Sequence, residues 1–254
     1  MLQAIDDLEL SSLLPSFLTS VTSSSSTGAE GEGEEVTVLD LGCGTGRNTE
    51  KILRHTWGGG SGGGGGGAQK INVVGLDFSQ GMLDVAFRKL TPLVEREGKN
   101  EGRLSLRLEC CDCFPTAASA AGASPLPAVQ GLTTVDAVVS TLVLEHVPLN
   151  AFFATLAALL RRRGVALVTN MHEEMGRRSQ AGFVNEQGVK VRGSSFVYSV
   201  QETIDTARGA GFEVLSVMER EMSKGDVEGG KVGARGWKWV GTKVWYGLVL
   251  RKIV

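Results

Sequence analysis

The feature that most constrains the fold is the segment VTVLDLGCGTGRNTE, residues 36–50, in which an apolar run is followed by three glycines at alternate positions. The apolar run predicts a buried strand, and the residues after the glycines predict a helix. Because glycine lacks a Cβ, a turn built from Gly42, Gly44 and Gly46 can be tight and lets a ligand approach the backbone closely. A dinucleotide-binding turn would place a third glycine or an alanine at position 47, where this chain has Arg47. The segment therefore predicts a ligand site of another class at a strand–turn–helix unit.

Short apolar runs alternate with helical stretches along the rest of the chain. The runs are rich in Val and Leu on both faces, as expected for a parallel sheet covered by helices. The order strand, helix, strand predicts an α/β fold with a doubly wound, mostly parallel sheet. We expect strands at 36–41, 71–77, 104–112, 135–141, 164–170, within 199–221 and at 242–253, and helices at 2–18, 48–56, 80–97, 149–163 and early in 199–221.

The pattern divides the chain into two parts. Residues 1–35 are predicted to form an amphipathic N-terminal helix and a flexible acidic connector, and residues 36–254 one α/β domain large enough for a buried core. The glycine-rich insertion at 58–67 precedes a strand, so it is expected at the sheet edge opposite the ligand crevice and has no predicted ligand role. The insertion at 114–131 is expected to be a variable surface loop.

Composition limits the classes of partner. The chain has 254 residues, of which 42% are apolar, and a net charge of −2, which provides no general attraction to nucleic acid or to an anionic membrane. Asp6, Asp7 and Glu9 occupy the region where a secretion signal would carry basic residues, and no apolar stretch reaches the roughly 18 residues of a membrane span. Three of the four cysteines lie in CCDC (110–113), which lacks the paired spacing of a zinc site. We expect a cytoplasmic protein with reduced thiols, without nucleic-acid or membrane partners.

The alternate-glycine turn preceded by Leu-Asp resembles motif I of the class I S-adenosylmethionine-dependent methyltransferases, and the resemblance extends over most of residues 36–221. It implies a seven-stranded sheet whose last strand is inserted antiparallel beside the fifth. It also implies an enzyme with S-adenosylmethionine as cofactor. In that family the turn passes beneath the methionyl portion, which implies backbone contacts at Gly42, Cys43 and Gly44 and an indirect amine contact through Asp40.

Acidic residues end the next two predicted strands. A carboxylate at Asp77 can accept hydrogen bonds from both ribose hydroxyls, and it lies about 20 residues after the turn once the glycine insertion is discounted. The string DFSQGML resembles the second motif of the family and implies that Phe78 and Met82 flank the adenine; the alternative for Met82 is core packing. Asp112 matches the acidic adenine contact of the family, and its alternative is a surface loop. The predicted cofactor set is completed by Gly46, Cys113 and Thr141.

The fourth strand and its continuation, VDAVVSTLVLEHV (135–147), resemble motif IV, whose end lies beside the transferred methyl group. The Asn/Asp-Pro-Pro-aromatic string of adenine and cytosine amino-methyltransferases is missing, as are the paired glutamates of protein arginine methyltransferases. LEHVP is instead similar to ubiquinone-pathway O-methyltransferases and many small-molecule enzymes. The resemblance therefore favours methylation of a small molecule at oxygen or nitrogen.

Glu145 and His146 are the candidate catalytic residues. An imidazole near neutrality can accept a hydroxyl proton as oxygen attacks the methyl group, whereas an amine or thiolate needs little beyond positioning and exclusion of water. The alternative is that His146 only caps the strand. A Glu-x-x-Glu-His metal string would need a glutamate where this chain has Leu142, so we predict no metal.

The segment 171–198 follows the fifth strand, where the family often places substrate-recognition insertions. His172, Arg178 and Tyr198 are candidates for contact with a polar or anionic small molecule, and the alternative is a solvated lid without direct contact. Arg161–Arg163 are expected at a helix end, where they would interact favourably with the helix dipole. Trp237 and Trp239 are expected in a hairpin loop. The competing functions are a protein or RNA methyltransferase and a cofactor-binding protein without catalysis.

Overall fold

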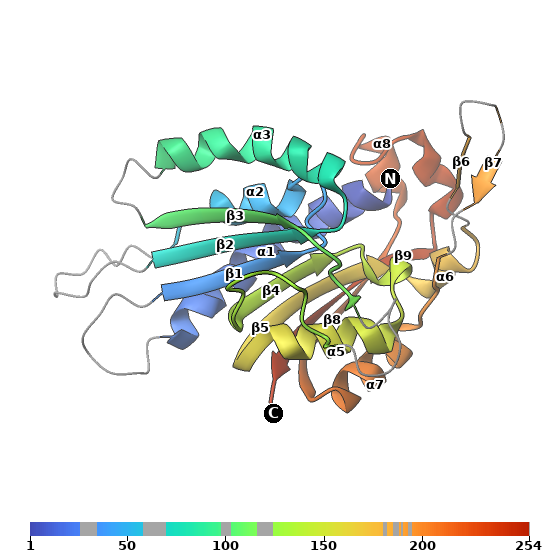
Figure 1. Cartoon of the computed structure of the whole chain (residues 1–254). Helices are drawn as coiled ribbons and strands as arrows, with labels where there is room; N and C mark the ends of the chain where they lie inside the picture. The colour runs from blue at the N-terminus through green and yellow to red at the C-terminus, as the bar shows by residue number, and fades with distance from the viewer. Residues whose placement is uncertain are drawn as a thin grey trace.

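The computed structural model describes residues 1–25, 35–57, 70–97, 103–115, 124–179, 182–184, 188, 190–192 and 195–253. Seven strands form one sheet in the order β3-β2-β1-β4-β5-β9-β8 (Figure 1). The strands β1 to β5 pair in parallel, and β9 is antiparallel to both β5 and β8. The predicted topology is thus confirmed. The strands are β1 Glu35–Leu41, β2 Lys70–Asp77, β3 Leu104–Cys110, β4 Val135–Thr141, β5 Leu160–Met171, β8 Phe212–Glu221 and β9 Lys243–Lys252.

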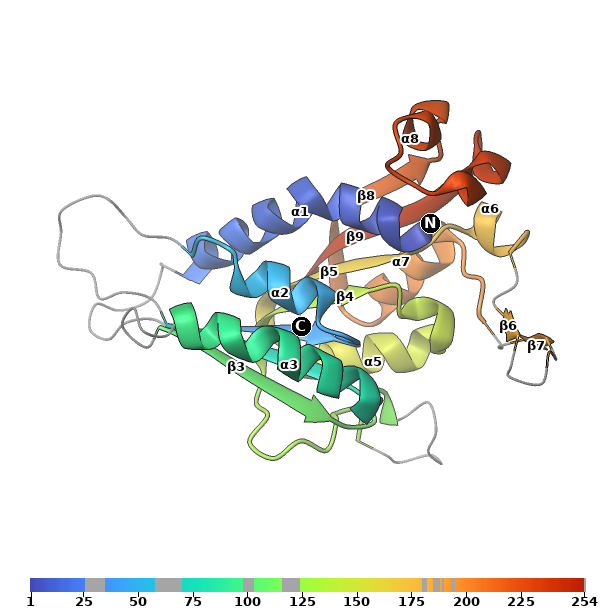
Figure 2. The same ribbon diagram turned by 90° about the horizontal axis from the view of Figure 1, so that it is seen from above.

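Helices cover both faces of the sheet (Figures 1 and 2). The helices α1 (Leu2–Ser25), α2 (Arg47–Leu53) and α3 (Gln80–Glu97) share one buried cluster with the sheet residues that face them. On the opposite face, α5 (Leu149–Leu159) and α7 (Val200–Gly209) contribute to a second cluster. Both faces of the central strands are therefore buried, which explains their continuous apolar sequence.

The N-terminal helix is longer than its sequence pattern predicts. It continues to Ser25, beyond the expected end at residue 18, because Val21 is buried against the same face of the sheet as Leu14 and Leu18. Residues 22–25 of the expected connector are thus helical, and residues 26–34 lie outside the described residues. The glycine run 58–67 also lies outside them, as do residues 116–123 of the expected surface loop.

Helix α5 is shorter than predicted, and the expected dipole role of Arg161–Arg163 is wrong. The helix ends at Leu159, and the following residues belong to β5. Leu160 is fully buried and pairs with Val135 of β4, while the Arg161 guanidinium forms an ion pair with Asp136. These strand contacts outweigh the helical pattern at this point.

The connection between β8 and β9 is also different from the expected hairpin loop. It contains α8 (Lys224–Glu228) and the 3-10 helix η2 (Ala234–Trp239). Trp239 is only 3% exposed and packs in a third apolar cluster, whereas Trp237 is half exposed. The tryptophan pair is therefore divided between the core and the surface.

The remaining elements lie at the end of the sheet where the parallel strands finish (Figure 1). They are η1 (Leu144–His146), α6 (Glu173–Gly176) and a small antiparallel pair formed by β6 (Gly182–Val184) and β7 (Lys190–Arg192). In the parts of the chain that the structure describes, no helix is both long and apolar enough to cross a bilayer.

Candidate active site

The glycine turn is fixed by the neighbouring strand and is open at one position. The N–H groups of Gly42 and Cys43 donate to the Leu76 carbonyl at 2.9 and 3.0 Å. Gly42 has a φ of +78°, and a Cβ there would lie 2.6 Å from a methyl group of Val143. Gly44 has a φ of +54°, but a Cβ there would meet only the Met82 sulfur, at 3.7 Å. The turn is therefore packed at its entry, and a ligand can approach its backbone at Gly44.

Asp77 occupies the predicted strand end and contacts the turn directly. Its side chain is 6% exposed, and its two carboxylate oxygens accept hydrogen bonds from the Gly44 N–H at 2.8 Å and the Ser79 N–H at 2.9 Å. A carboxylate oxygen can accept more than one hydrogen bond. Asp77 can therefore hold the turn and still receive hydroxyl donors from a ligand.

Two large apolar side chains are exposed beside this carboxylate. Phe78 is 80% exposed and Met82 is 47% exposed, so Met82 is not part of the core. The Asp112 carboxylate is exposed and accepts the Phe114 N–H at 2.9 Å. Cys113, in contrast, is buried among apolar residues, so its side chain belongs to the core rather than to the surface of the site.

Asp40 precedes the turn, Cys43 belongs to it, and both side chains are buried. The Asp40 carboxylate is 2% exposed and accepts a hydrogen bond from the Thr49 hydroxyl at 2.6 Å. Burial raises its pKa to about 6, although the Thr49 hydrogen bond and the Arg47 charge oppose the shift. Burial also raises the pKa of the Cys43 thiol well above its usual range. Ionisation of either buried side chain therefore costs free energy.

The end of β4 has an unusual backbone. Leu142 has a φ of +57°, and its N–H donates to the Thr169 carbonyl at 2.8 Å. The preceding Thr141 hydroxyl accepts hydrogen bonds from Asn48 at 2.7 Å and from Arg47 at 3.2 Å. The left-handed conformation is unfavourable for leucine, so the contacts around it must hold the turn in place.

Glu145 and His146 lie in the short helix η1 that follows. The His146 side chain is 58% exposed, and its Nε2 lies 3.6 Å from Oε1 of Glu145, whose side chain is 17% exposed. Burial raises the pKa of Glu145, and the neighbouring imidazole opposes the shift. An accessible imidazole thus lies beside a half-buried carboxyl group just after the end of β4.

Comparisons with known proteins agree with this geometry. A family model described as a methyltransferase domain matches residues 39–166. An uncharacterized methyltransferase from Emericella nidulans is 37% identical over 256 residues, which cover 97% of this chain and 83% of that protein. The chain belongs to the class I S-adenosylmethionine-dependent methyltransferases.

Solved structures share the fold of this methyltransferase. Geranyl diphosphate C-methyltransferase from Streptomyces coelicolor A3(2) aligns with a TM-score of 0.57 at 13% identity, covering 98% of this chain and 84% of that chain. A putative sarcosine dimethylglycine methyltransferase from Galdieria sulphuraria aligns with a TM-score of 0.53 at 14% identity, covering 98% and 85%. At these identities the likeness establishes the architecture only.

Membership of this family implies S-adenosylmethionine as the methyl donor, and the residues present fit it. The backbone is open at Gly44, and Asp77 offers a fixed carboxylate at the end of the second strand. Exposed Phe78 and Met82 supply apolar surface for an aromatic ring. In the described residues, no group of three or more His, Cys, Asp or Glu side chains is arranged to hold a metal ion.

The three predicted substrate residues lie in different surroundings. Tyr198 donates its hydroxyl to the Val147 carbonyl at 3.2 Å, one residue after His146. The Arg178 guanidinium instead donates to Thr242 at 2.8 Å and lies over the Trp239 ring. Of these two, only Tyr198 contacts the segment that carries the candidate catalytic pair.

His172 is engaged within the methyltransferase itself. It is 3% exposed, its Nδ1 accepts the Glu174 N–H at 3.1 Å, and its Nε2 lies 2.8 Å from Glu219. Both ring nitrogens are thus used to cap α6 and to bind β8. In this conformation neither is free for a substrate. Residues 180–181, 185–187, 189 and 193–194 of the predicted lid lie outside the described residues.

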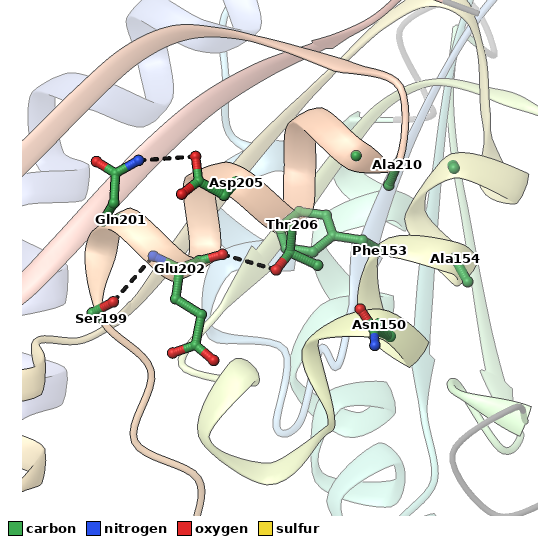
Figure 3. Close-up of a pocket in the computed structure, with 11 residues that line it drawn as sticks. Asn150, Phe153, Ala154, Ser199, Gln201, Glu202, Asp205, Thr206 and Ala210 are labelled. Carbon is green, nitrogen blue, oxygen red and sulfur yellow. Dashed lines mark hydrogen bonds between the residues drawn. The ribbon is translucent and has the colours of Figure 1, made fainter.

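A hollow of about 920 Å³ lies elsewhere, between α5 and α7 (Figure 3). Its wall along α7 carries Gln201 and Asp205, which hydrogen-bond to each other at 2.9 Å. No residue predicted for the cofactor or for catalysis lines it. The methyltransferase site is therefore assigned from the strand ends and not from this hollow.

Sequence reasoning missed one part of the site, the contact of Arg47 with Asp6 and Asp7. The Arg47 guanidinium donates to Asp6 at 2.5 Å and to Asp7 at 2.8 Å, so α1 reaches the exit of the glycine turn. The available signal was a pair of adjacent carboxylates within the amphipathic helical pattern of residues 2–18. The basic partner, about 40 residues away in sequence, could not be identified from periodicity.

Proposed function

We propose that the protein transfers the methyl group of S-adenosylmethionine to an oxygen or nitrogen atom of a small molecule. The observation that carries the proposal is the convergence of the open glycine turn, Asp77 and the Glu145–His146 pair at the carboxyl ends of β1, β2 and β4. Ligands of open α/β sheets bind in the crevice outside these strand ends.

The cofactor would be held in three parts. The backbone at Gly44 would lie beneath the methionyl portion. The Asp77 carboxylate would accept hydrogen bonds from the ribose hydroxyls, and the Asp112 carboxylate would accept one from the adenine amine. Phe78 and Met82 flank the adenine ring, since both present exposed apolar surface next to the turn. Of the remaining predicted contacts, Cys43 and Cys113 would act through their backbone because their side chains are buried.

His146 would accept the proton of the attacking group. Bound S-adenosylmethionine supplies an electrophilic methyl group, and the chain contributes alignment and proton removal. The exposed imidazole can receive a proton from a hydroxyl or an amine, and the half-buried Glu145 lies beside it, 3.6 Å from its Nε2. Tyr198, hydrogen-bonded next to this segment, is the best placed of the predicted substrate residues.

The acceptor class can be tested directly. The chain is incubated with methyl-labelled S-adenosylmethionine and a size-fractionated cell extract, and the label is followed by fraction. Label in the small-molecule fraction supports the proposal. Label confined to protein or RNA overturns the acceptor class, and binding of S-adenosylhomocysteine without any transfer indicates a cofactor-binding protein.

The role of His146 is tested by His146→Ala. We expect turnover to fall by about 10²- to 10⁴-fold, the usual contribution of a general base. The affinity for S-adenosylhomocysteine, measured by calorimetry, should be preserved. His55→Ala is the matched control, because His55 follows the C-terminal end of α2, whereas the glycine turn precedes the N-terminal end of that helix. Near-normal turnover of His146→Ala would leave His146 with a structural role only.

A further inference from the structure

Asp6 of helix α1 is a fully buried carboxylate at the junction of three elements. Its side chain is 0% exposed and accepts hydrogen bonds from Arg47 at 2.5 Å, from the Thr169 hydroxyl at 2.6 Å and from the Trp245 indole at 2.8 Å. These donors belong to α2, β5 and β9. The N-terminal helix is thereby attached to the strand ends that surround the candidate site.

Arg47 connects Asp6 to the glycine turn. It is the first residue of α2 and directly follows Gly46, which has a φ of +74°. Its guanidinium is shared between Asp6 and the Thr141 hydroxyl, 3.2 Å away at the end of β4. Holding Arg47 thus fixes both the exit of the glycine turn and the strand end that leads to Leu142.

We propose that Asp6 is a positioning residue of the cofactor site, which acts through Arg47 and makes α1 one wall of that site. The proposal rests on the proposed function, because it assumes that the glycine turn binds the cofactor. A buried ion pair adds little net stability after the cost of desolvation, so its main effect is on geometry. A turn that is ordered before binding loses less entropy when the ligand arrives, and its affinity is correspondingly higher.

The helix has a separate apolar anchor. Leu10, Leu14, Phe17 and Leu18 are all buried in the cluster between α1 and the sheet. A variant that loses only the charge of Asp6 should therefore keep α1 docked. This separates the positioning effect from a general loss of the helix.

Asp7 provides the matched control. It binds the same guanidinium at 2.8 Å, but its side chain is 41% exposed and is shared with Lys51. Exposed ion pairs contribute little. Asp7→Asn removes the same charge one residue away, so a difference between it and Asp6→Asn reports on the buried contact and not on net charge.

The measurement is the affinity for S-adenosylhomocysteine by calorimetry, with circular dichroism to verify the fold. We expect Asp6→Asn to weaken binding by about tenfold or more, since the loss of the buried partner leaves the Arg47 guanidinium with the exposed Asp7 as its remaining ion-pair partner. Asp7→Asn should stay within about threefold of the unaltered chain. Equal affinities of Asp6→Asn and the unaltered chain overturn the proposal.

Two further variants test the route through Arg47. In the double variant Asp6→Asn/Arg47→Gln, the loss of affinity should equal that of either single variant, because both act through one contact; losses that multiply would overturn the route. If Asp6→Asn does not fold, Arg47→Lys decides, since lysine keeps the charge but lacks the planar fork that binds Asp7 through Nη1 and both Asp6 and Thr141 through Nη2. Unchanged affinity of Arg47→Lys would overturn the proposal. Failure of the unaltered chain to bind S-adenosylhomocysteine would instead refute the proposed cofactor site.

Discussion

Asp40 carries a buried carboxyl group whose ionisation destabilises the folded state. It is 2% exposed, and burial raises its pKa from 3.8 to about 6, against the opposing Thr49 hydrogen bond. Asparagine has nearly the same shape, keeps an oxygen for the Thr49 hydroxyl and carries no charge. We therefore expect Asp40→Asn to make the ligand-free protein more stable near neutral pH, and the gain to grow as the pH rises.

The magnitude follows from the two pKa values. Below pH 3.8 the carboxyl group of Asp40 is protonated in both the folded and the unfolded chain, so its ionisation has no effect on stability. Between pH 3.8 and about 6 the unfolded chain ionises first, and the folded state loses stability progressively. At about 1.4 kcal/mol per pKa unit, the full cost is about 3 kcal/mol. Roughly half of it is already present at pH 5, so the stability gap between the two proteins should widen by about 1.4 kcal/mol from pH 5 to pH 8.

Urea unfolding at several pH values measures this gap, with the free energy of unfolding extrapolated to zero denaturant for each protein. A constant difference caused by the packing of the amide cancels, because only the change with pH is compared. Asp205→Asn is the control, since the Asp205 side chain is 61% exposed on α7, and its gap should stay flat. A gap for Asp40→Asn that remains constant or narrows with increasing pH would refute the reasoning. The same variant should bind S-adenosylhomocysteine more weakly, because it lacks the charge that the ligand amine would favour.

Two further substitutions separate binding from stability. Phe78→Ala should change the free energy of unfolding by less than about 0.5 kcal/mol but weaken S-adenosylhomocysteine binding about tenfold in calorimetry, because an exposed ring is lost from the proposed adenine site. Phe87, which is exposed on α3, provides the control, and Phe87→Ala should change neither quantity. His172→Ala should lower the free energy of unfolding by about 1–3 kcal/mol, since it removes the cap of Glu174 and the contact with Glu219. Its turnover should remain near normal, and impaired turnover at unchanged stability would point to a substrate role instead.

The sheet could be predicted from the sequence because its information is local. Each parallel strand is a short apolar run bounded by glycine, polar residues or a helical pattern, and four of the five predicted runs start within two residues of the observed strands, the exception being β5. The error at Leu160–Arg163 has a tertiary cause. The partners of this segment, Val135 and Asp136, lie 25 residues earlier in the neighbouring strand, and no local pattern reports that pairing.

The sequence predicts where the site residues lie better than it predicts which of their side chains can contact a ligand, because position depends on local pattern and availability on distant elements. Asp77 ends a strand next to the glycine turn, so topology alone brings it to Gly44. His172 also ends a strand, but its orientation depends on Glu219, which arrives from a strand 47 residues later. Strand-end position therefore predicts proximity to the crevice, whereas side-chain availability requires knowledge of every element that packs around it.

Leu142 directly follows β4, three residues before the candidate catalytic residue Glu145. Its side chain packs against the third apolar cluster, which includes Met171 and Trp245, and its backbone is left-handed. A carboxylate at this position would have to leave that apolar contact or be desolvated within it, and either is costly. Apolar packing thus determines the side chain at the end of β4, and the candidate catalytic residues Glu145 and His146 follow it in η1. Leu142→Glu should therefore destabilise the strand end without creating a metal site, because the apolar packing is lost and, among the described residues, no group of three or more His, Cys, Asp or Glu side chains is arranged to hold a metal ion.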